Sequence, residues 1–441
     1  MTKITITALL VYISSFLSSQ DFRVYEQLEK KSENYLRYFE VPDKGVLVEI
    51  STVAKKGGRV VFNESYKFYD KELQNSWTLE KLYSIEMLKR RYLENQKNIS
   101  ENERTLSIDP SGRYCLIYEQ VTATFYRINI EDGTVLSQTA NSSRYENGAK
   151  LASYIDEGYC YVIQSDYTLG RKKSKQFELI RVDIDQMNIE KFDLETPYVG
   201  DIRGLATRLW EPLGVRNNIL YFKDNYGIQL KEDKSYYKRI ILLNLENELV
   251  DDQYLFFGDR PVNDDFVGEV FFNKFNNGML YTYSWSKNDK EKTILCAGYD
   301  SKLNKMWAKE YPSHIMGGLK LGISDVEALK IRDEVFMTHF YGHTEFIFKV
   351  NTDNSAFDFK IIDLSTAESS KQKKYTMHNF QFDILCEYPA IKEYITLDGK
   401  EKPEKIVMKP IFMDDLIIIS KQAFSVYPDA DEFIELVAFK I

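Results

Sequence analysis

Seven short apolar runs recur along the chain, and each is entered through a polar turn. They are residues 45–48, 112–117, 158–163, 218–222, 278–281, 334–337 and 415–419. A run that is apolar on both faces is typical of a strand buried inside a stack of sheets. The recurrence therefore predicts a repeat architecture in which each unit buries its apolar faces against its neighbours.

The sequence after each run reads as a strand, a turn and a second strand. The clearest copies share the pattern Y-D-x-x-L-x-x-x-W, which begins at Tyr69 and again at Tyr299. An Asp suits the end of a strand, and the Trp would open the next one. Weaker copies of the unit begin with residues 125–130, 179–184, 240–245 and 346–350 as their first strand. The first two of these strands show the period of two that is typical of a half-buried strand.

These units predict an all-β chain that forms a β-propeller of about seven four-stranded blades. Six or eight blades remain alternatives, because the two longest intervals between the runs have room for further strands. The last unit ends with residues 433–441 as its third strand, so residues 21–28 are expected to add the fourth and join the two chain ends. The rival fold, two β-sandwich domains, predicts a linker or a composition break near the middle, and the sequence contains neither.

Two further segments bear on the domain organisation. Residues 79–97 have a helical composition and predict a helical insertion within a single domain of residues 20–441. Residues 1–19 fit an export signal, with Lys3, an apolar stretch at 4–17, small residues before the cleavage point, and Gln20 as the first mature residue. A buried N-terminal strand or helix is the alternative. We expect an exported chain, periplasmic or extracellular, without a membrane span after cleavage.

The Ser-Ser-Gln end of this signal and the Y-D-x-x-L-x-x-x-W units carry a resemblance. On them the whole chain resembles exported, propeller-like proteins of Bacteroidota, many of them uncharacterised. These motifs are not specific to one family. The resemblance implies the fold and export, and it assigns neither an enzyme activity nor any functional residue.

Charge, motifs and cysteines narrow the function classes. A formal net charge of −9 argues against a nucleic-acid partner. The motifs of nucleotide-binding, serine-hydrolase and zinc sites are absent, so we expect no cofactor. The four cysteines are Cys115, Cys160, Cys296 and Cys386. They lie in apolar runs and predict buried free thiols, with disulfides as the alternative in an exported protein.

One connection between two units combines residues suited to ligand binding. Residues 198–214 contain Asp201, Arg203, Arg208, Trp210 and Glu211. An exposed Trp beside charged side chains suits a sugar or a peptide. The alternative is that Trp210 packs in the core and that the charged residues only decorate the surface.

Metal sites have little support in the sequence. His339 and His343 are four residues apart, about 13 Å on a continuous strand. That is too far for one ion unless Gly342 bends the chain, so ordinary hydrogen-bonded histidines are the alternative. Asp264 with Asp265, and residues 429–432, are interpreted as solvated turns, with calcium as an alternative at 429–432.

A repeat fold without a recognisable catalytic constellation predicts a non-enzymatic binding or scaffold protein of the bacterial cell envelope. Its loops would present a surface to a protein or a glycan. The alternative is an exported hydrolase that acts on glycans through carboxylates around a central channel, because the fold alone does not decide between them.

Overall fold

The computed structural model describes residues 22–28, 33–56, 59–88, 104–119, 122–140, 150–156, 158–165, 176–195, 210–229, 236–246, 250–258, 267–273, 279–285, 293–300, 302–312, 326–331, 334–341, 344–350, 357–363, 388–395, 411–413, 415–419 and 433–440. These segments contain strands and one α-helix, α5 (Pro389–Ile395). No helix among them is long and apolar enough to cross a membrane. The export signal predicted at residues 1–19 lies outside the described residues.

The chain divides into two compact units, residues 1–144 with 377–441, and residues 145–376. The described part of the first unit contains three four-stranded antiparallel sheets. One consists of β2 (Glu33–Val41), β3 (Gly45–Lys56), β4 (Arg59–Asp70) and β5 (Asn75–Leu88). The next consists of β6 (Arg104–Ile108), β7 (Tyr114–Glu119), β8 (Thr124–Asn129) and β9 (Val135–Thr139). The third consists of β26 (Ile411–Met413), β27 (Leu416–Ile419), β28 (Phe433–Lys440) and β1 (Phe22–Gln27).

The described part of the second unit contains four more such sheets. They are β10 (Lys150–Asp156), β11 (Tyr159–Ser165), β12 (Gln176–Asp183) and β13 (Ile189–Glu195); β14 (Trp210–Arg216), β15 (Ile219–Gln229), β16 (Tyr236–Asn244) and β17 (Val250–Gly258); β18 (Val267–Asn273), β19 (Met279–Trp285), β20 (Thr293–Tyr299) and β21 (Lys305–Pro312); and β22 (Val326–Ile331), β23 (Glu334–Tyr341), β24 (Thr344–Val350) and β25 (Phe357–Asp363). Consecutive strands pair in chain order within each sheet.

The seven apolar runs supply the second strand of the seven sheets, as the sequence predicts. These strands are β3, β7, β11, β15, β19, β23 and β27. A second strand is an inner strand of its sheet, with a hydrogen-bonded neighbour on each side. In β7 and β27 nearly every residue is buried. The prediction of seven four-stranded units is thus confirmed.

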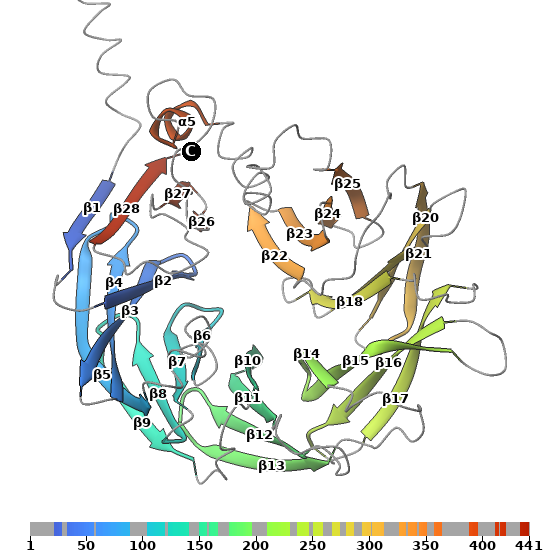
Figure 1. Cartoon of the computed structure of the whole chain (residues 1–441), viewed down its shortest axis with the longest axis horizontal. Coiled ribbons are helices and arrows are strands. Elements are labelled where there is room, and N and C mark those ends of the chain that lie inside the picture. The colour runs from blue at the N-terminus through green and yellow to red at the C-terminus, as the bar shows by residue number, and fades with distance from the viewer. Residues whose placement is uncertain are drawn as a thin grey trace, which may run out of the picture. The chain divides into compact units, whose positions relative to one another are not determined.

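The two ends of the chain share one sheet. β1 pairs antiparallel with β28, in a register that runs from Phe22 opposite Ala438 to Gln27 opposite Phe433 (Figure 1). β28 in turn pairs with β27, which is part of the last unit in the sequence. The predicted closure by residues 21–28 is confirmed, and the all-β fold has the strand order of a seven-bladed propeller.

Neighbouring sheets within each unit pack face to face. In the first unit the sheet β2–β5 contributes to two apolar clusters, one shared with β6–β9 and one shared with the sheet that β1 completes. In the second unit the sheet β14–β17 packs against β10–β13 and also against β18–β21. Each of these sheets therefore shields apolar residues of the next, as the repeat predicts.

An Asp or Asn ends the third strand, or follows it directly, in five sheets and fixes the turn that comes next. These residues are Asp70, Asn129, Asp183, Asn244 and Asp300. In the two Y-D-x-x-L-x-x-x-W units the Asp Oδ1 accepts two backbone N–H groups, at 2.9 and 2.8 Å in both copies. The Leu of each copy then adopts a left-handed backbone, with φ of 56° and 61°. The motif is therefore a turn whose side chain replaces missing backbone hydrogen bonds.

The Trp of the first copy reaches from its own sheet to the next. The Trp77 Nε1–H donates to the carbonyl oxygen of Ile130 at 2.7 Å, in the turn between β8 and β9. Gly133 in the same turn has a φ of 72°, and a Cβ there would lie 2.9 Å from the indole. A glycine at this position thus permits both the backbone conformation and the approach of the Trp.

The helical insertion predicted at residues 79–97 is wrong over residues 79–88. That stretch continues β5, which pairs with β4 as far as Leu88 opposite Arg59. The register shifts between Glu64 and Tyr66, and Lys81 in the facing strand has a φ of 52°. This bulge interrupts the alternation by which a strand is recognised, and pairing along β4 outweighs the local helical propensity. Residues 89–97 lie outside the described residues, and a single domain over 20–441 stays a prediction.

Two cysteines are described, and both fit the predicted free, buried thiols. Cys115 and Cys160 lie in second strands, are buried and form no disulfide. Burial raises the pKa of the Cys160 thiol to about 12. A thiol of this kind behaves as a small apolar side chain and not as a nucleophile at neutral pH. The side chains of Cys296 and Cys386 lie outside the described residues.

Candidate functional site

The predicted binding residues fall at the start of one strand. Trp210 and Glu211 are the first two residues of β14, and their cross-strand partners in β15 are Asp224 and Lys223. A register shift follows at once, between Pro212 and Gly214. Asp201, Arg203 and Arg208 lie outside the described residues. The structure therefore places two of the five candidates, which are consecutive in sequence, at the start of a strand. That all five form one site stays a prediction.

That strand end belongs to the end of the sheet where the longer connections join. In a meander the turns between strands one and two, and three and four, share one end of the sheet. At that end the longest interval between two consecutive described strands of a sheet is residues 351–356. The other end receives the links between strands two and three and between successive sheets, such as residues 166–175, 196–209 and 364–410. Trp210 and Glu211 are thus the first residues of β14, at the end of the sheet where the longer connections join the strands.

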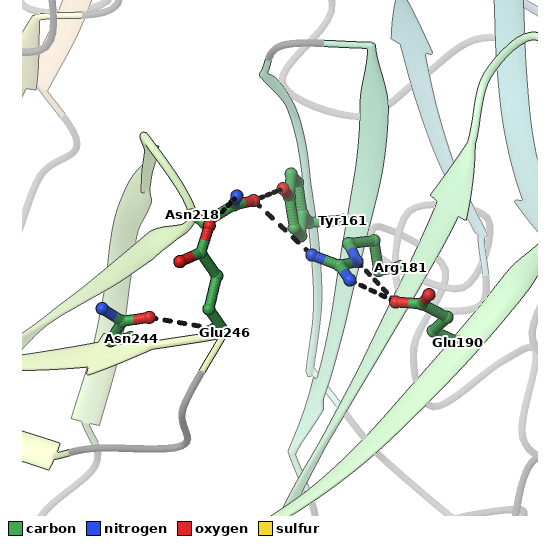
Figure 2. Close-up of polar contacts among 6 residues, drawn as sticks. All are labelled: Tyr161, Arg181, Glu190, Asn218, Asn244 and Glu246. Carbon is green, nitrogen blue, oxygen red and sulfur yellow. Dashed lines mark hydrogen bonds and ion pairs between the residues drawn. The ribbon is translucent and has the colours of Figure 1, made fainter.

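At the opposite end of β14, a polar cluster joins two sheets (Figure 2). Asn218 follows β14, and its Oδ1 accepts hydrogen bonds from the Tyr161 hydroxyl at 3.0 Å and the Arg181 Nη1 at 3.5 Å. Its Nδ2 donates to Glu246 Oε1 at 3.2 Å, while the Glu246 N–H donates to Asn244 Oδ1 at 2.9 Å. One amide side chain therefore connects β11 and β12 with the turn after β16.

The guanidinium in this cluster is held from several sides. Arg181 lies over the rings of Tyr159, at 4.9 Å, and Phe192, at 5.4 Å. Its Nε donates to Glu190 Oε2 at 2.8 Å, from the facing position in β13 (Figure 2). These contacts fix the guanidinium within its own sheet while Asn218 reaches it from the next. The cluster is built to hold two sheets in register, and its side chains are occupied in doing so.

Buried carboxylates form a second group that the sequence analysis missed. Glu49 and Glu64 are 0% and 1% exposed, on the face of β3 and β4 that packs against β6–β9. Glu49 pairs with Arg37 and accepts a hydrogen bond from the Tyr66 hydroxyl at 2.8 Å. Glu64 accepts one from Ser51 at 2.7 Å. Each bond joins cross-strand neighbours, so the carboxylates tie strands together inside the sheet.

A third buried carboxylate lies in the neighbouring sheet. Glu119, at the end of β7 and 2% exposed, accepts the backbone N–H of Thr122 at 2.8 Å. Tyr126 stacks on Tyr83 of the facing sheet with ring centroids 5.2 Å apart. Burial and the nearby Glu119 carboxylate raise the pKa of Tyr126. The signal for these groups was a charged residue inside an otherwise apolar run, such as Glu49 in residues 45–53.

Of the predicted histidine and acidic candidates, His339 is the one whose backbone the structure describes. His339 lies within β23, opposite Val326 and Phe346. His343, Asp264, Asp265 and residues 429–432 lie outside the described residues. Among the residues that the structure describes, no three His, Cys, Asp or Glu side chains are grouped so that they could hold a metal ion.

The fold and these contacts define a class: an all-β repeat protein of propeller type, with sheets joined by polar side chains. No protein-family model matches the chain, and no curated protein matches it. Some of the solved structures that it is similar to are described as β-propeller or WD40 domains. One is the β-propeller domain of the Trilobed protease from Pyrococcus furiosus, at 10% identity and a TM-score of 0.41, covering 92% of this chain and 93% of that one.

Two WD40 domains give comparable likenesses. That of Toxoplasma gondii coronin has 6% identity and a TM-score of 0.37, covering 96% of this chain and 88% of that chain. That of SCAP from fission yeast has 11% identity and a TM-score of 0.29, covering 92% and 98%. At such identities and TM-scores the likeness carries no argument about function. The fold class follows from the strand pairing itself.

Proposed function

We propose that the protein is a non-enzymatic binding or scaffold protein of the bacterial cell envelope, which presents its longer connections to a protein or glycan. One observation carries the proposal: Trp210 and Glu211 open β14 at the end of the sheet where those connections join. Binding residues are commonly carried by loops on a rigid scaffold, and a Trp beside a carboxylate suits a sugar or peptide.

The polar side chains that join strands and sheets support a scaffold role. Asn218 with Arg181, and Glu49 with Arg37 and Tyr66, are engaged in joining strands and sheets. Buried networks of this kind make a structure rigid when their members are paired. A rigid set of sheets would hold the connections between them in fixed positions, which lowers the entropy lost on binding a partner.

Binding screens on the purified mature chain test this proposal. We expect retention of a subset of oligosaccharides or peptides on glycan and peptide arrays. Trp210→Ala/Glu211→Ala should weaken that binding by at least about tenfold, because a Trp in a binding site commonly contributes a large share of the affinity. Tyr25→Ala is the matched control, since it removes an aromatic side chain that is 60% exposed in another sheet. Equal losses in both variants would contradict the assignment, and sugar released from a glycan would favour the hydrolase.

Export is a separate part of the proposal and has its own measurement. In a bacterial host, the chain recovered from the periplasm or medium should begin at Gln20, as N-terminal sequencing or intact mass would show. Replacing apolar residues of 4–17 by charged ones should keep the chain in the cytoplasm with its N-terminus uncleaved. A wild-type chain that stays cytoplasmic and uncleaved would contradict export without bearing on the binding surface.

A further inference from the structure

The fourth strand of each sheet has a hydrogen-bonded neighbour among the described strands on one side only. These outer strands are β1, β5, β9, β13, β17, β21 and β25. Six of them contain at least two charged residues, such as Arg23 and Glu26 in β1. β9, with the sequence VLSQT, contains none. Charged side chains on an edge strand oppose pairing with another chain, so β9 lacks a protection that the other six have.

The side chains of β9 are exposed on both faces of the sheet. Leu136, Ser137, Gln138 and Thr139 are exposed, and Leu136 keeps 53% of its accessible surface. Val135 alone in this strand is half-buried, where it packs against the core shared with the sheet β2–β5. The strand is therefore accessible over four of its five residues.

The backbone of β9 also presents hydrogen-bonding groups at the outer edge of its sheet. The Thr134 carbonyl oxygen and the Ala140 N–H, which flank the strand, form hydrogen bonds of 2.9 and 2.7 Å on the side of β8. The register between β8 and β9 is continuous, and successive residues of a strand direct their N–H and C=O groups to opposite sides. Val135, Ser137 and Thr139 therefore direct theirs away from β8, to a side on which no described strand pairs with β9.

We propose that β9 pairs antiparallel with β9 of a second copy of this chain, about a two-fold axis at Ser137. In this register Val135 lies opposite the partner's Thr139, and Ser137 lies opposite itself, so the outward backbone groups of the two copies can form about six hydrogen bonds. Charge favours a second copy as the partner. A charged strand that pairs with itself brings like charges close together, and β9 avoids this repulsion because it has no charged residue. The contact lies on a different sheet from Trp210 and is independent of the ligand proposed above.

Self-association of the full chain tests the proposal. Two paired strands of five residues form a small interface, so the dimer should be weak, with a dissociation constant on the order of 100 μM. Sedimentation equilibrium at concentrations of about 10–500 μM brackets this value. Association should strengthen as salt rises, because each copy has a formal net charge of −9 and salt screens the repulsion between copies. A chain that stays monomeric over this range would overturn the proposal, even if it bound an extended peptide.

Charge substitutions at the two-fold axis locate the contact. Ser137→Lys and Ser137→Glu should each lower the association constant about fivefold, because like charges then lie opposite each other. An equimolar mixture of the two variants should recover at least the original association, because Lys then lies opposite Glu, whereas a loss caused by misfolding would persist on mixing.

Gln27→Lys and Gln27→Glu make the same charge changes at an exposed position of another outer strand, β1. They should leave the association constant within about twofold of the original, alone or mixed. Circular dichroism confirms that all four variants remain folded. Equal losses in the Gln27 and Ser137 variants, or no recovery when the two Ser137 variants are mixed, would overturn the proposal.

Discussion

A chain that lacks β1, residues Phe22–Gln27, should unfold at a thermal midpoint about 10 °C or more below that of the complete chain. β1 supplies the fourth strand of the sheet that contains β28, and its loss leaves the edge of β28 unpaired. Phe22 and Val24 pack in the apolar cluster shared with the sheet β2–β5. Burying two such half-buried side chains stabilises the fold by about 2–3 kcal/mol, and each ladder hydrogen bond adds about 1 kcal/mol.

Polar contacts raise the cost of losing β1. The Arg23 guanidinium pairs with Glu435 at 2.8 Å, and the Tyr394 hydroxyl of α5 donates to the same carboxylate at 3.0 Å. Burial and this carboxylate raise the pKa of Tyr394. Glu26 accepts a hydrogen bond from the Tyr69 hydroxyl at 2.9 Å, from β4 of the neighbouring sheet. The deletion therefore removes links to two sheets at once.

Calorimetry or thermal circular dichroism measures this effect, with light scattering to detect association through the exposed strand edge. Gln27→Ala is the control, because Gln27 is exposed and ends the β1 ladder. Its midpoint should stay within about 2 °C of the original value. A deletion variant as stable as the control would show that β1 does not complete the sheet.

Gly133→Ala should destabilise the first unit by about 2–4 kcal/mol through two separable causes. The φ of 72° at this position is strained for any residue with a Cβ, at a cost of about 1–2 kcal/mol. The new Cβ would also lie 2.9 Å from the Trp77 indole, which must move and lose its 2.7 Å hydrogen bond to Ile130. Denaturant unfolding of both forms gives the free-energy difference.

A double-mutant cycle with Trp77→Ala separates the two causes. In the Trp77→Ala background, Gly133→Ala should cost only its backbone strain, so the two substitutions together should destabilise less than their sum. Trp77→Phe keeps the stacking with Phe68, whose ring lies 5.8 Å away, and removes only the N–H donor. It should cost about 1 kcal/mol. Strict additivity of Trp77→Ala and Gly133→Ala would contradict a direct contact between the two sheets at this point.

The sequence predicted most of the fold because an inner strand of each sheet coincides with a recognisable apolar run. Burial on both faces and hydrogen bonding on both sides favour a continuous apolar run, as in residues 415–419. The closure was predictable for a related reason, since the last unit lacked a fourth strand and residues 21–28 had the alternation to supply it. The turn that an Asp or Asn begins in five sheets could be recognised only in part from the sequence. Its left-handed position has no common residue type, since it is occupied by Leu73, Gly133 and Met187 in three of the sheets.

The helical prediction at 79–97 failed where long-range pairing outweighed local preference. Leu79, Leu82 and Met87 favour a helix by composition, yet β4 offers this stretch a hydrogen-bonding partner along its full length. The register shift places two extra residues of β5 opposite Ser65, and Lys81 stands where the alternation of Trp77, Leu79 and Tyr83 would otherwise have an apolar residue. A register of this kind depends on the neighbouring strand and is not encoded in the local sequence.

The candidate site is predictable from sequence only in part. The composition of 198–214 indicated a ligand-binding connection, and the strand order places Trp210 and Glu211 at the end of the sheet that such connections share. The hydrogen bonds of Asn218 and Glu49 were not predictable, because each depends on which strands become neighbours. A polar residue in an apolar run indicates that its side chain needs a hydrogen-bonding partner, but only the strand register identifies that partner.

Disulfide trapping between β1 and β28 tests the central claim most directly. Gln27 lies opposite Phe433 in the β1–β28 ladder, so Gln27→Cys/Phe433→Cys should form an intramolecular disulfide under mild oxidation. Gln27→Cys/Ile434→Cys places the two thiols on opposite faces of the sheet and should not. Peptide mass spectrometry of the cross-linked chain distinguishes these pairs. Efficient trapping of the first pair alone is the predicted result, and equal trapping of both, or of neither, would contradict a sheet completed by the two chain ends.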